Sequence, residues 1–260
     1  MGEPAPRLRI RSTSYIVIPA RLGSTRLPRK LLRRDTGKTL IQHTYEAALE
    51  ATLPSGVCVA TDHGEIFNEV RSFGGEVCMT SPAAPSGTDR VAEVARQLAD
   101  VDIVVNLQGD EPELSGEAID LAISLLEQNP EAAMSTLATP IRSRQQLEDP
   151  ACVKVVFDHR GRALYFSRST IPFPRSWDDA LLSRDAPAFY QHIGLYAYRR
   201  RFLLQLASMP PSRLEKLEKL EQLRVLEAGY AILVGVVQEP SFGIDTPEDY
   251  CAFVQRYRGR

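Results

Sequence analysis

The sequence predicts an α/β protein whose central sheet is mostly parallel, with a smaller lobe of mixed strands in its second half. In the first 130 residues, short apolar runs alternate with segments of helical periodicity; the runs are 15–19 (YIVIP), 57–61 (VCVAT) and 102–107 (DIVVNL). Continuous apolar strands of this kind are typical of a parallel sheet that helices cover on both faces. Beyond about residue 130 the apolar runs are separated by irregular, proline-containing segments.

The expected elements follow from periodicity and from the residues that end each run. Apolar spacing predicts one more strand at 76–79, and helices over 38–51, 63–73, 88–99 and 115–128. The second half is expected to hold a proline-rich loop at 171–188, and strands at 133–138, 153–157, 163–167, 191–198 and 231–237. Thr246 as N-cap and Pro247 at the first helical position predict a last helix over 247–257.

One long helix is expected over 213–228 (RLEKLEKLEQLRVLEA). Four leucines recur in it at intervals of three residues, which places them on one side of a helix: Leu214, Leu217, Leu220 and Leu223. The repeat is too short for a coiled coil.

These elements are expected to form one domain of two lobes. A loose basic arm over 1–14 would precede a single domain over 15–260, in which 15–130 and 243–260 form one lobe and 131–242 the other. No apolar run approaches the roughly 20 residues that span a bilayer, and the arm lacks the apolar stretch of a signal peptide. We therefore expect a cytoplasmic protein without a membrane contact.

The composition limits the partners of the protein. Lys and Arg number 31 against 33 Asp and Glu, so the net charge of −2 gives no general attraction to nucleic acid or to an anionic membrane. Anion binding must come from local clusters. The cysteines are scattered and form no C-x-x-C pair, which favours buried, reduced thiols at Cys58, Cys78, Cys152 and Cys251.

The loop after the first strand is a candidate phosphate site. Between Arg21 and Lys38 it holds seven basic residues and one acidic residue. Small side chains around Ser24 let backbone N–H groups approach phosphate oxygens, and Arg21 and Lys30 supply positive charge. The loop has neither G-x-x-x-x-G-K-[ST] nor G-x-G-x-x-G, so a solvated basic turn is the open alternative.

Two carboxylates are candidates for a metal site. In NLQGDEPEL, Asp110 follows the most apolar strand, and strand ends of a parallel sheet meet at one rim. Near a triphosphate it would be placed to hold Mg²⁺, with Gln108 facing the same space; the alternative is that these residues only make a turn. In GIDTPED, helix capping accounts for Thr246 and Pro247 but leaves Asp245 as a possible second ligand.

Two further segments contribute polar residues. SGTDRVAE opens a helix with Ser86 and carries Arg90 near its start, which fits an anion site, although Thr88 could serve only as a cap. LYFSRSTIP and QHIGLYAY place Arg168, His192 and Tyr196 in the second half. A lone histidine is more often structural than catalytic.

Together these segments resemble the 3-deoxy-manno-octulosonate (Kdo) cytidylyltransferases, also called CMP-Kdo synthetases. The resemblance runs from about Tyr15 to Tyr250 and rests on IPARLGSTRLPRK, ATDHGEI, GGEVCMT, SGTDRVAEV, VVNLQGDEPEL, ALYFSRSTIP, QHIGLYAYR, LEKLEQLRVLEAG and GIDTPEDY in that order. It implies a glycosyltransferase-A-like (Rossmann-like) nucleotidyltransferase fold. It further implies transfer of CMP from CTP to Kdo, giving CMP-Kdo and pyrophosphate for lipopolysaccharide synthesis, with Mg²⁺ as cofactor and a homodimer as the assembly.

The resemblance also implies roles for single residues. The first lobe would bind CTP through Ala20, Arg21, Ser24, Lys30, Ser86, Arg90 and Gln108. Asp110 and Asp245 match the two magnesium-binding aspartates, and with Arg21 and Lys30 they would be the catalytic residues. The second lobe would hold the sugar acid and the dimer contact, with the sugar at Arg168, His192, Tyr196, Glu221 and Gln222. Arg168 would meet the Kdo carboxylate as a paired donor.

Two departures from the family pattern stand out. Most relatives have L-P-G-K where this chain has Leu27-Pro28-Arg29-Lys30, so a cation replaces the flexible residue before the lysine. Many relatives have S-G-T-E-R where this chain carries Asp89, a shorter acid.

Two other functions are open at this point. A cytidylyltransferase for another acidic sugar, of the sialic or pseudaminic acid type, would look alike on the CTP side, although ALYFSRSTIP and QHIGLYAY favour Kdo. A non-catalytic nucleotide-binding protein would be expected to have lost an aspartate or the lysine, and this chain keeps Asp110, Asp245 and Lys30.

Overall fold

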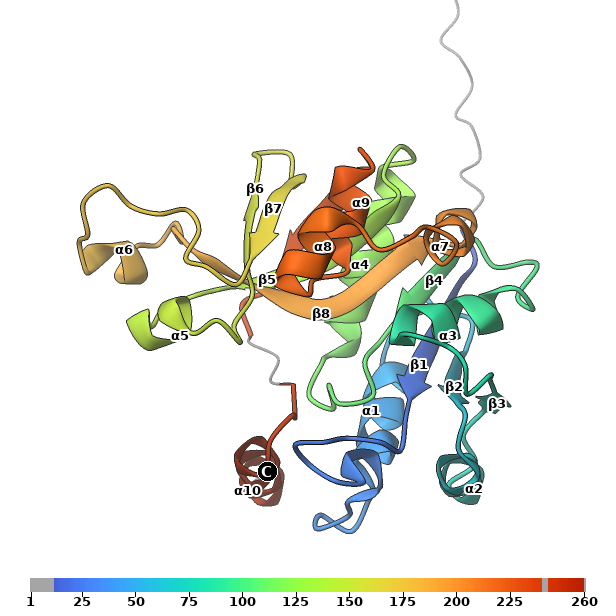
Figure 1. Ribbon diagram of the computed structural model, residues 1–260. Coiled ribbons are helices and arrows are strands. Elements are labelled where there is room, and N and C mark those ends of the chain that lie inside the picture. The colour runs from blue at the N-terminus through green and yellow to red at the C-terminus, as the bar shows by residue number, and fades with distance from the viewer. Residues whose placement is uncertain (1–11, 240–242, 260) are drawn as a thin grey trace, which may run out of the picture.

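The computed structural model describes residues 12–239 and 243–259, so all but the last three residues of the predicted 1–14 arm lie outside the described part. A nine-stranded sheet runs through the molecule (Figure 1). Its strands are β1 (Ser14–Ala20), β2 (Val57–Thr61), β3 (Val77–Met79), β4 (Ile103–Asn106), β5 (Met134–Pro140), β6 (Lys154–Phe157), β7 (Ala163–Ser167), β8 (Tyr190–Arg199) and β9 (Ile232–Val236). The main order is β3-β2-β1-β4-β8-β5-β9, and β6 pairs with both β7 and β8.

The sheet changes character at β8. Strands β3, β2, β1 and β4 are parallel to one another. The long strand β8 is antiparallel to β4 on one side and to β5 on the other, and β5 pairs in parallel with β9. The predicted α/β class, with a parallel first half and a mixed second half, is therefore confirmed.

Alternate residues of the central strands enter two different hydrophobic cores. In β1, Ile16 and Ile18 belong to one core and Val17 to the other; in β4 the same alternation separates Ile103 and Val105 from Val104. Strands that are apolar on both sides must be covered on both sides, since successive side chains point to opposite faces. This explains the continuous apolar runs in the sequence.

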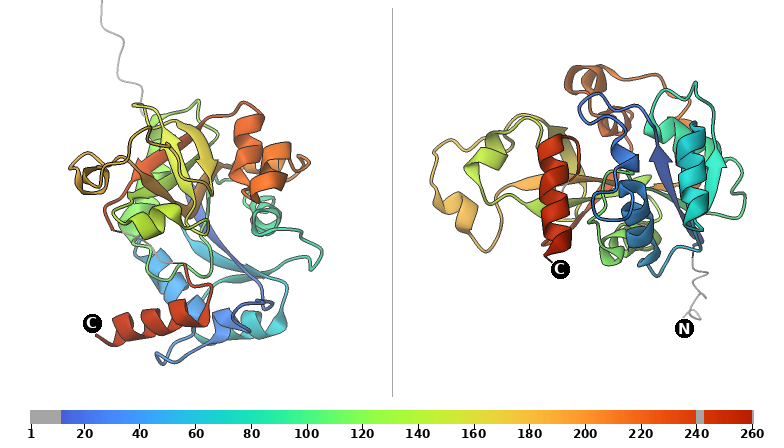
Figure 2. Two further views of the ribbon diagram at one scale, coloured as in Figure 1. Left: turned by 60° about the vertical axis from the view of Figure 1, so that its left-hand side comes forward. Right: turned by 90° about the horizontal axis from the view of Figure 1, so that it is seen from below.

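The helices divide between the two faces accordingly. One core receives side chains from α1 (Leu40–Leu49), α2 (Gly64–Ser72), α4 (Gly116–Gln128) and α10 (Pro247–Arg258). The other receives side chains from α3 (Gly87–Ala95), α7 (Arg200–Leu206) and α9 (Gln222–Glu227). Figure 2 shows the last helix, α10, beside the early blue segments rather than beside its neighbours in sequence.

Specific contacts hold α10 against the start of the chain. The Tyr250 hydroxyl accepts a hydrogen bond from the Asp35 backbone N–H at 3.0 Å. The His43 ring meets the Phe253 ring edge-on at 5.2 Å, and Arg256 forms an ion pair with Glu113 at 2.5 Å. These contacts bring the segment that contains Asp245 next to the loop after β1.

One predicted helix is wrong in length and continuity. In place of a single helix over 213–228 there are two, α8 (Arg213–Glu218) and α9, which begins at Gln222. Lys219 between them has φ 55° and ψ 45°, the left-handed conformation that ends a helix. The spacing of the leucines gave no sign of this break. Leu217 is exposed whereas Leu220 and Leu223 are buried on the sheet side, so the leucines do not form one continuous buried face.

Four short helices were not predicted. They are the 3₁₀ helix η1 (Lys30–Leu32) and the α-helices α5 (Arg144–Glu148), α6 (Ala180–Ser183) and α7. Segments of this length carry too little periodicity to be read from sequence. All four cysteines are free thiols, as predicted, but the expected burial holds only for Cys58 and Cys152, since Cys78 is half-buried and Cys251 is exposed. Among residues 12–239 and 243–259, no helix has the length and apolarity that crossing a membrane requires.

Candidate active site

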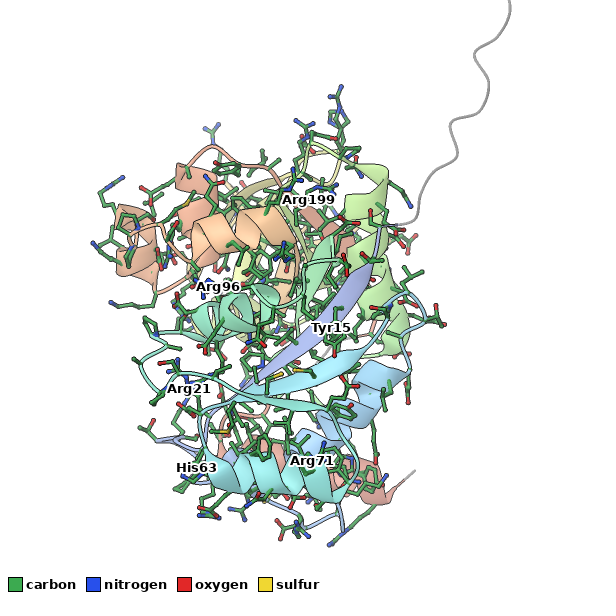
Figure 3. The ribbon with its side chains drawn as sticks, turned by 90° about the vertical axis from the view of Figure 1, so that its right-hand side faces the viewer. Tyr15, Arg21, His63, Arg71, Arg96 and Arg199 are labelled. Atoms are coloured by element: carbon green, nitrogen blue, oxygen red, sulfur yellow. The ribbon has the colours of Figure 1, made fainter. Side chains whose placement is uncertain are left out.

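A cavity of about 400 Å³ lies where β1 and β4 end. Its walls come from the loop after β1, from Gly87 at the start of α3, from the loop after β4 and from Asp245. Figure 3 shows Arg21 beyond the end of β1, on the side of the molecule that carries α2 and α3. This is the rim on which an open α/β sheet binds its ligands. We call this cavity the smaller pocket.

The Lys30 ammonium group lies at the centre of the charges in the smaller pocket. Its Nζ lies 2.6 Å from Asp110 Oδ2 and 3.0 Å from Asp245 Oδ1. Burial lowers the pKa of Lys30, but the Asp110 carboxylate and then the Asp245 carboxylate more than offset this, so the net shift is upward and the group stays charged. The second Asp245 oxygen accepts from Arg26 Nη2 at 2.9 Å. Two carboxylates thus converge on one ammonium group, and a second cation, Arg26, pairs with one of them.

The backbone explains why the two aspartates meet. The Ile244 N–H donates to the Asp110 carbonyl at 2.9 Å, which joins the segment before α10 to the loop after β4. Thr44 on α1 donates from its hydroxyl to the Gly109 carbonyl at 2.9 Å. A Cβ at Gly109 would lie 3.2 Å from the Pro19 carbonyl oxygen, so glycine lets these two loops approach each other.

A larger pocket of about 1130 Å³ adjoins the first. Arg26, Gln108 and Asp245 line both. Glu111 in the loop after β4 also lines the larger pocket, and the other walls come from the second half of the chain. They include Arg142, Gln146, Arg168, Gln191, His192, Tyr196, Lys219, Glu221 and Gln222. Several cations in these walls could meet a ligand carboxylate, and the amides and hydroxyls could bind its hydroxyl groups.

Glu221 connects the two pockets. One of its oxygens accepts from Thr88 Oγ1 at 2.5 Å and the other from Ser86 Oγ at 3.3 Å. Both partners lie at the start of α3, where Ser86 is the N-cap and forms a capping box with Asp89. Burial raises the pKa of Glu221, while the Thr88 hydrogen bond lowers it in part. The turn between α8 and α9 is thereby fixed to the helix that borders the smaller pocket.

His192 is held as a neutral imidazole. Its Nε2 lies 2.8 Å from the Thr136 hydroxyl, and its ring meets Phe166 edge-on at 5.1 Å. Burial lowers the pKa of His192 to about 3. The ring can therefore donate or accept a hydrogen bond at neutral pH but carries no charge.

Comparison with known proteins places this geometry in a family. The cytidylyltransferase family model matches residues 15–232. The 3-deoxy-manno-octulosonate cytidylyltransferase of Rhodopirellula baltica is 52% identical over 242 residues, covering 93% of this chain and 97% of that protein. The chain belongs to the 3-deoxy-manno-octulosonate cytidylyltransferase family. The enzyme of that name from Syntrophotalea carbinolica is 49% identical, covering 94% of this chain and 98% of the relative.

Other relatives qualify and extend the match. The 8-amino-3,8-dideoxy-manno-octulosonate cytidylyltransferase of Shewanella halifaxensis is also 49% identical, covering 90% of this chain and 94% of the relative. Among solved structures, a CMP:2-keto-3-deoxy-manno-octonic acid synthetase complexed with CTP superposes with a TM-score of 0.88 at 40% identity. That match covers 95% of this chain and 99% of the other. The predicted nucleotidyltransferase fold is confirmed by this match.

Most of the predicted site residues lie in the walls of the two pockets. Arg21, Ser24, Lys30, Gln108, Asp110 and Asp245 line the smaller pocket. Arg168, His192, Tyr196, Glu221 and Gln222 line the larger one. Ala20, Ser86 and Arg90 lie in the walls of neither pocket. Ser86 instead caps α3, and Ala20 is buried in the core.

Arg90 is a buried structural cation in this arrangement. It is fully buried, its Nη2 donates to Asp62 Oδ2 at 2.8 Å, and its Nη1 donates to Thr80 Oγ1. These partners follow β2 and β3, so Arg90 ties α3 to the ends of two strands. The nucleotide contact that the resemblance implies for Arg90 stays a prediction.

Arg168 is anchored more than the resemblance implied. Its Nε donates to the Glu218 carbonyl at 2.7 Å and its Nη1 to the Pro150 carbonyl at 3.0 Å. No described residue accepts a hydrogen bond from the third guanidinium nitrogen, Nη2. Nη1 carries two hydrogens, so its second hydrogen together with Nη2 could still make the paired donation expected for a sugar carboxylate.

The pocket walls also contain residues that the sequence did not single out. Arg26 lines both pockets and binds Asp245, and its membership of the basic loop was the only signal. Lys219 and Gln191 line the larger pocket, and Lys154 lies behind its wall. Gln191 lies in the QHIGLYAYR motif and Lys219 in the LEKLEQLRVLEAG motif, but no spacing or charge pattern marks either of them or Lys154.

Proposed function

We propose that the protein transfers CMP from CTP to 3-deoxy-manno-octulosonate, giving CMP-Kdo and pyrophosphate, and so activates Kdo for lipopolysaccharide synthesis. The observation that carries this is the meeting of Asp110, Asp245 and Lys30 in the smaller pocket of a chain 52% identical to a named enzyme of this activity. The triphosphate is assigned to the smaller pocket and the sugar acid to the larger one. Because Arg26, Gln108 and Asp245 line both, the two substrates would meet at those residues.

The residues of the smaller pocket fit a magnesium ion. Carboxylate oxygens of Asp110 and Asp245 already converge on one cation, the Lys30 ammonium. Hard oxygen donors are the ligands that Mg²⁺ prefers, and it commonly takes one or two carboxylates together with phosphate oxygens and water. Among the described residues no group of three or more His, Cys, Asp or Glu side chains could hold a metal, which agrees with a partly substrate-made site. Bound there, Mg²⁺ would neutralise phosphate charge and polarise the attacking hydroxyl.

The chain's own residues would position and stabilise the reacting groups. Lys30 and Arg21 place positive charge where the α-phosphate gains negative charge as the Kdo anomeric hydroxyl attacks and pyrophosphate leaves. Gly23 and Ser24 line the same wall, so their backbone N–H groups could donate to phosphate oxygens. No nucleophilic side chain is required, and no covalent enzyme intermediate is expected.

The larger pocket would bind Kdo mostly through neutral hydrogen bonds. His192 is uncharged and Gln222 is buried in the pocket wall, so both suit sugar hydroxyls. Arg26, Arg142, Arg168 and Lys219 are the cations that could meet the sugar carboxylate. An 8-amino analogue of Kdo is a second candidate substrate, because a relative named for it is 49% identical to this chain.

The decisive experiment is a pyrophosphate-release assay with purified protein, CTP and Mg²⁺. Kdo, 8-amino-3,8-dideoxy-manno-octulosonate and N-acetylneuraminate are offered as separate acceptors. We expect pyrophosphate release with Kdo and none with N-acetylneuraminate. Absence of turnover with Kdo would refute the proposal, and preference for the 8-amino sugar would reassign the substrate within the family.

We also propose a homodimer located in the cytoplasm. The family resemblance supports the dimer, and the exposed Leu164 on β7 and Leu217 on α8 are apolar side chains available for such a contact. Sedimentation at several protein concentrations would show a species of twice the 28.9 kDa chain mass. A monomer at all concentrations would contradict the dimer.

A further inference from the structure

Lys154, the first residue of β6, is a buried cation with no carboxylate partner among residues 12–239 and 243–259. Its side chain is fully buried. Its Nζ donates to three backbone carbonyls, those of Asp149 at 2.9 Å, Cys152 at 2.6 Å and Arg168 at 2.6 Å. All three donors of the ammonium group are therefore used, and each acceptor is a neutral dipole.

Stability alone does not account for this choice of residue. Moving an ammonium group out of water is costly, and an apolar side chain of similar volume commonly fills such a space at lower cost. An ammonium group with three directed hydrogen bonds fixes the relative positions of its acceptors, which an apolar side chain does not do.

The acceptors belong to the segments that form one wall of the larger pocket. Asp149, Cys152 and Val153 line the pocket on one side of Lys154, and Arg168 lines it on the other. Lys154 itself is absent from the wall and lies one layer behind it. Strand pairing links Lys154 and its neighbour to β8. Lys154 pairs with Gln191, and the next residue of β8, His192, donates from its N–H to the Val153 carbonyl at 2.8 Å.

Hydrogen bonds of Arg168 link the pocket wall to α8. The Arg168 N–H donates to Glu218 Oε2 at 2.7 Å, and its guanidinium binds the carbonyls of Glu218 and Pro150. Glu218 ends α8, immediately before the turn that holds Lys219 and Glu221. Lys154 and Arg168 thus join the 149–153 segment, the end of β7 and the end of α8.

We infer that Lys154 is a positioning residue for the acidic-sugar side of the reaction: its buried ammonium group fixes the backbone of the 149–153 segment and of Arg168, and so the shape of the larger pocket. This inference rests on the proposed function, which assigns the sugar to that pocket. Loss of the ammonium group frees three carbonyls and lets the wall shift. Because the smaller pocket is built from other loops, the nucleotide should bind as before.

The test compares Lys154→Met with the matched control Lys216→Met, which removes an exposed lysine that lines neither pocket. Lys154→Gln, which keeps two donors, is made in parallel. For each variant the KM for Kdo at saturating CTP, kcat, the Kd for CTP and the unfolding temperature are measured. We expect the KM for Kdo to rise about tenfold or more in Lys154→Met, the scale of a small misplacement of binding groups, with kcat and the Kd for CTP changing far less. Lys154→Gln should fall between the wild type and Lys154→Met.

Several outcomes would overturn the inference. These are a KM for Kdo near the wild-type value in folded Lys154→Met, a parallel loss of CTP binding, or failure of both variants to fold, which would make the residue structural only. Gln222→Ala separates this result from failure of the proposed function. If Gln222→Ala raises the KM for Kdo and Lys154→Met does not, only the inference fails. If neither variant changes the KM, the assignment of Kdo to the larger pocket fails as well.

Discussion

At the scale of single residues, the smaller pocket depends on charge placement. Asp110 and Asp245 face one ammonium group, and the proposed reaction needs that charge pattern when the α-phosphate is attacked. Asparagine keeps the shape of each side chain and removes its charge. These substitutions therefore test the electrostatic role with little change of packing.

We expect Asp110→Asn and Asp245→Asn each to lower kcat at least about 100-fold, because each removes a major part of the transition-state charge stabilisation. Pyrophosphate release under saturating substrates measures the effect. Asp35→Asn serves as a control, because this exposed aspartate lies in the walls of neither pocket. Near-normal turnover of either site variant would remove that aspartate from the proposed metal site.

Lys30 gives a second prediction at this scale. Its ammonium group lies between the two carboxylates. A divalent cation and this ammonium group would repel each other there, so Lys30→Met should bind Mn²⁺ more tightly than the wild type when CTP is absent. The same variant should lose turnover, because the triphosphate loses a cation.

A titration of Mn²⁺ monitored by its paramagnetic signal measures the affinity directly. Lys38→Met removes an exposed lysine that pairs with Glu46, and should leave Mn²⁺ binding unchanged. Equal or weaker Mn²⁺ binding by Lys30→Met would show that the lysine does not compete for the site.

At the scale of elements, two non-glycine residues hold the left-handed conformation at turns that shape the pockets. Arg29 has φ 54° just before η1, and Lys219 has φ 55° after α8. The left-handed region costs an L-residue roughly 1–2 kcal/mol, which glycine avoids. Arg29 is also the position where the family pattern has glycine. Its guanidinium forms an ion pair with Glu65 on α2 and lines neither pocket.

Lys219→Gly should therefore raise the free energy of unfolding by about 0.5–1 kcal/mol, since strain relief exceeds the added entropy of the unfolded chain. Urea unfolding measures the change. Lys216→Gly, within α8 itself, should be destabilising and is the matched control. If Lys219→Gly destabilised the protein, contacts of the Lys219 side chain would have to outweigh the backbone strain.

Arg29→Gly tests the other turn and the departure from the family pattern. The substitution relieves the same kind of strain but loses an exposed ion pair of small worth. We expect little change in stability and an unchanged Kd for CTP, because the guanidinium points to Glu65 rather than into the pocket. A clear change in CTP affinity by calorimetry would show that Arg29 acts on the path of Lys30.

At the scale of the whole molecule, buried histidines make stability depend on pH. Burial lowers the pKa of His192 from the usual 6.5 to about 3. Above pH 6.5 the ring is neutral in the folded and unfolded states. Between pH 6.5 and 3 the unfolded chain binds a proton that the folded chain does not, so the free energy of unfolding falls as the pH falls. His43, whose pKa burial also lowers, acts in the same direction.

His192→Gln should therefore show a weaker loss of stability on acidification than the wild type. Urea unfolding at several pH values across this window gives the slope. The exposed His159 is the control position, and His159→Gln should keep the wild-type slope. An unchanged slope in His192→Gln would mean that His192 titrates normally in the folded protein.

Sequence alone determined the elements that local pattern encodes. Apolar runs identified the buried strands, Thr246 and Pro247 identified the start of α10, and the strand ends placed Asp110 on the ligand-binding rim. The nine ordered motifs pointed to the family. These signals are local, because periodicity, caps and breakers act within a few residues of the position that they specify.

Only the tertiary structure decided which distant residues meet and which side chains are buried. It brought Asp245 to Asp110 through the Ile244 hydrogen bond, buried Arg90 against Asp62, broke the 213–228 helix at Lys219 and put the Lys154 ammonium behind a pocket wall. Each of these depends on a partner supplied by another part of the chain. The sequence does not show whether a charged residue faces solvent, a ligand or three buried carbonyls. Only the folded environment distinguishes these cases.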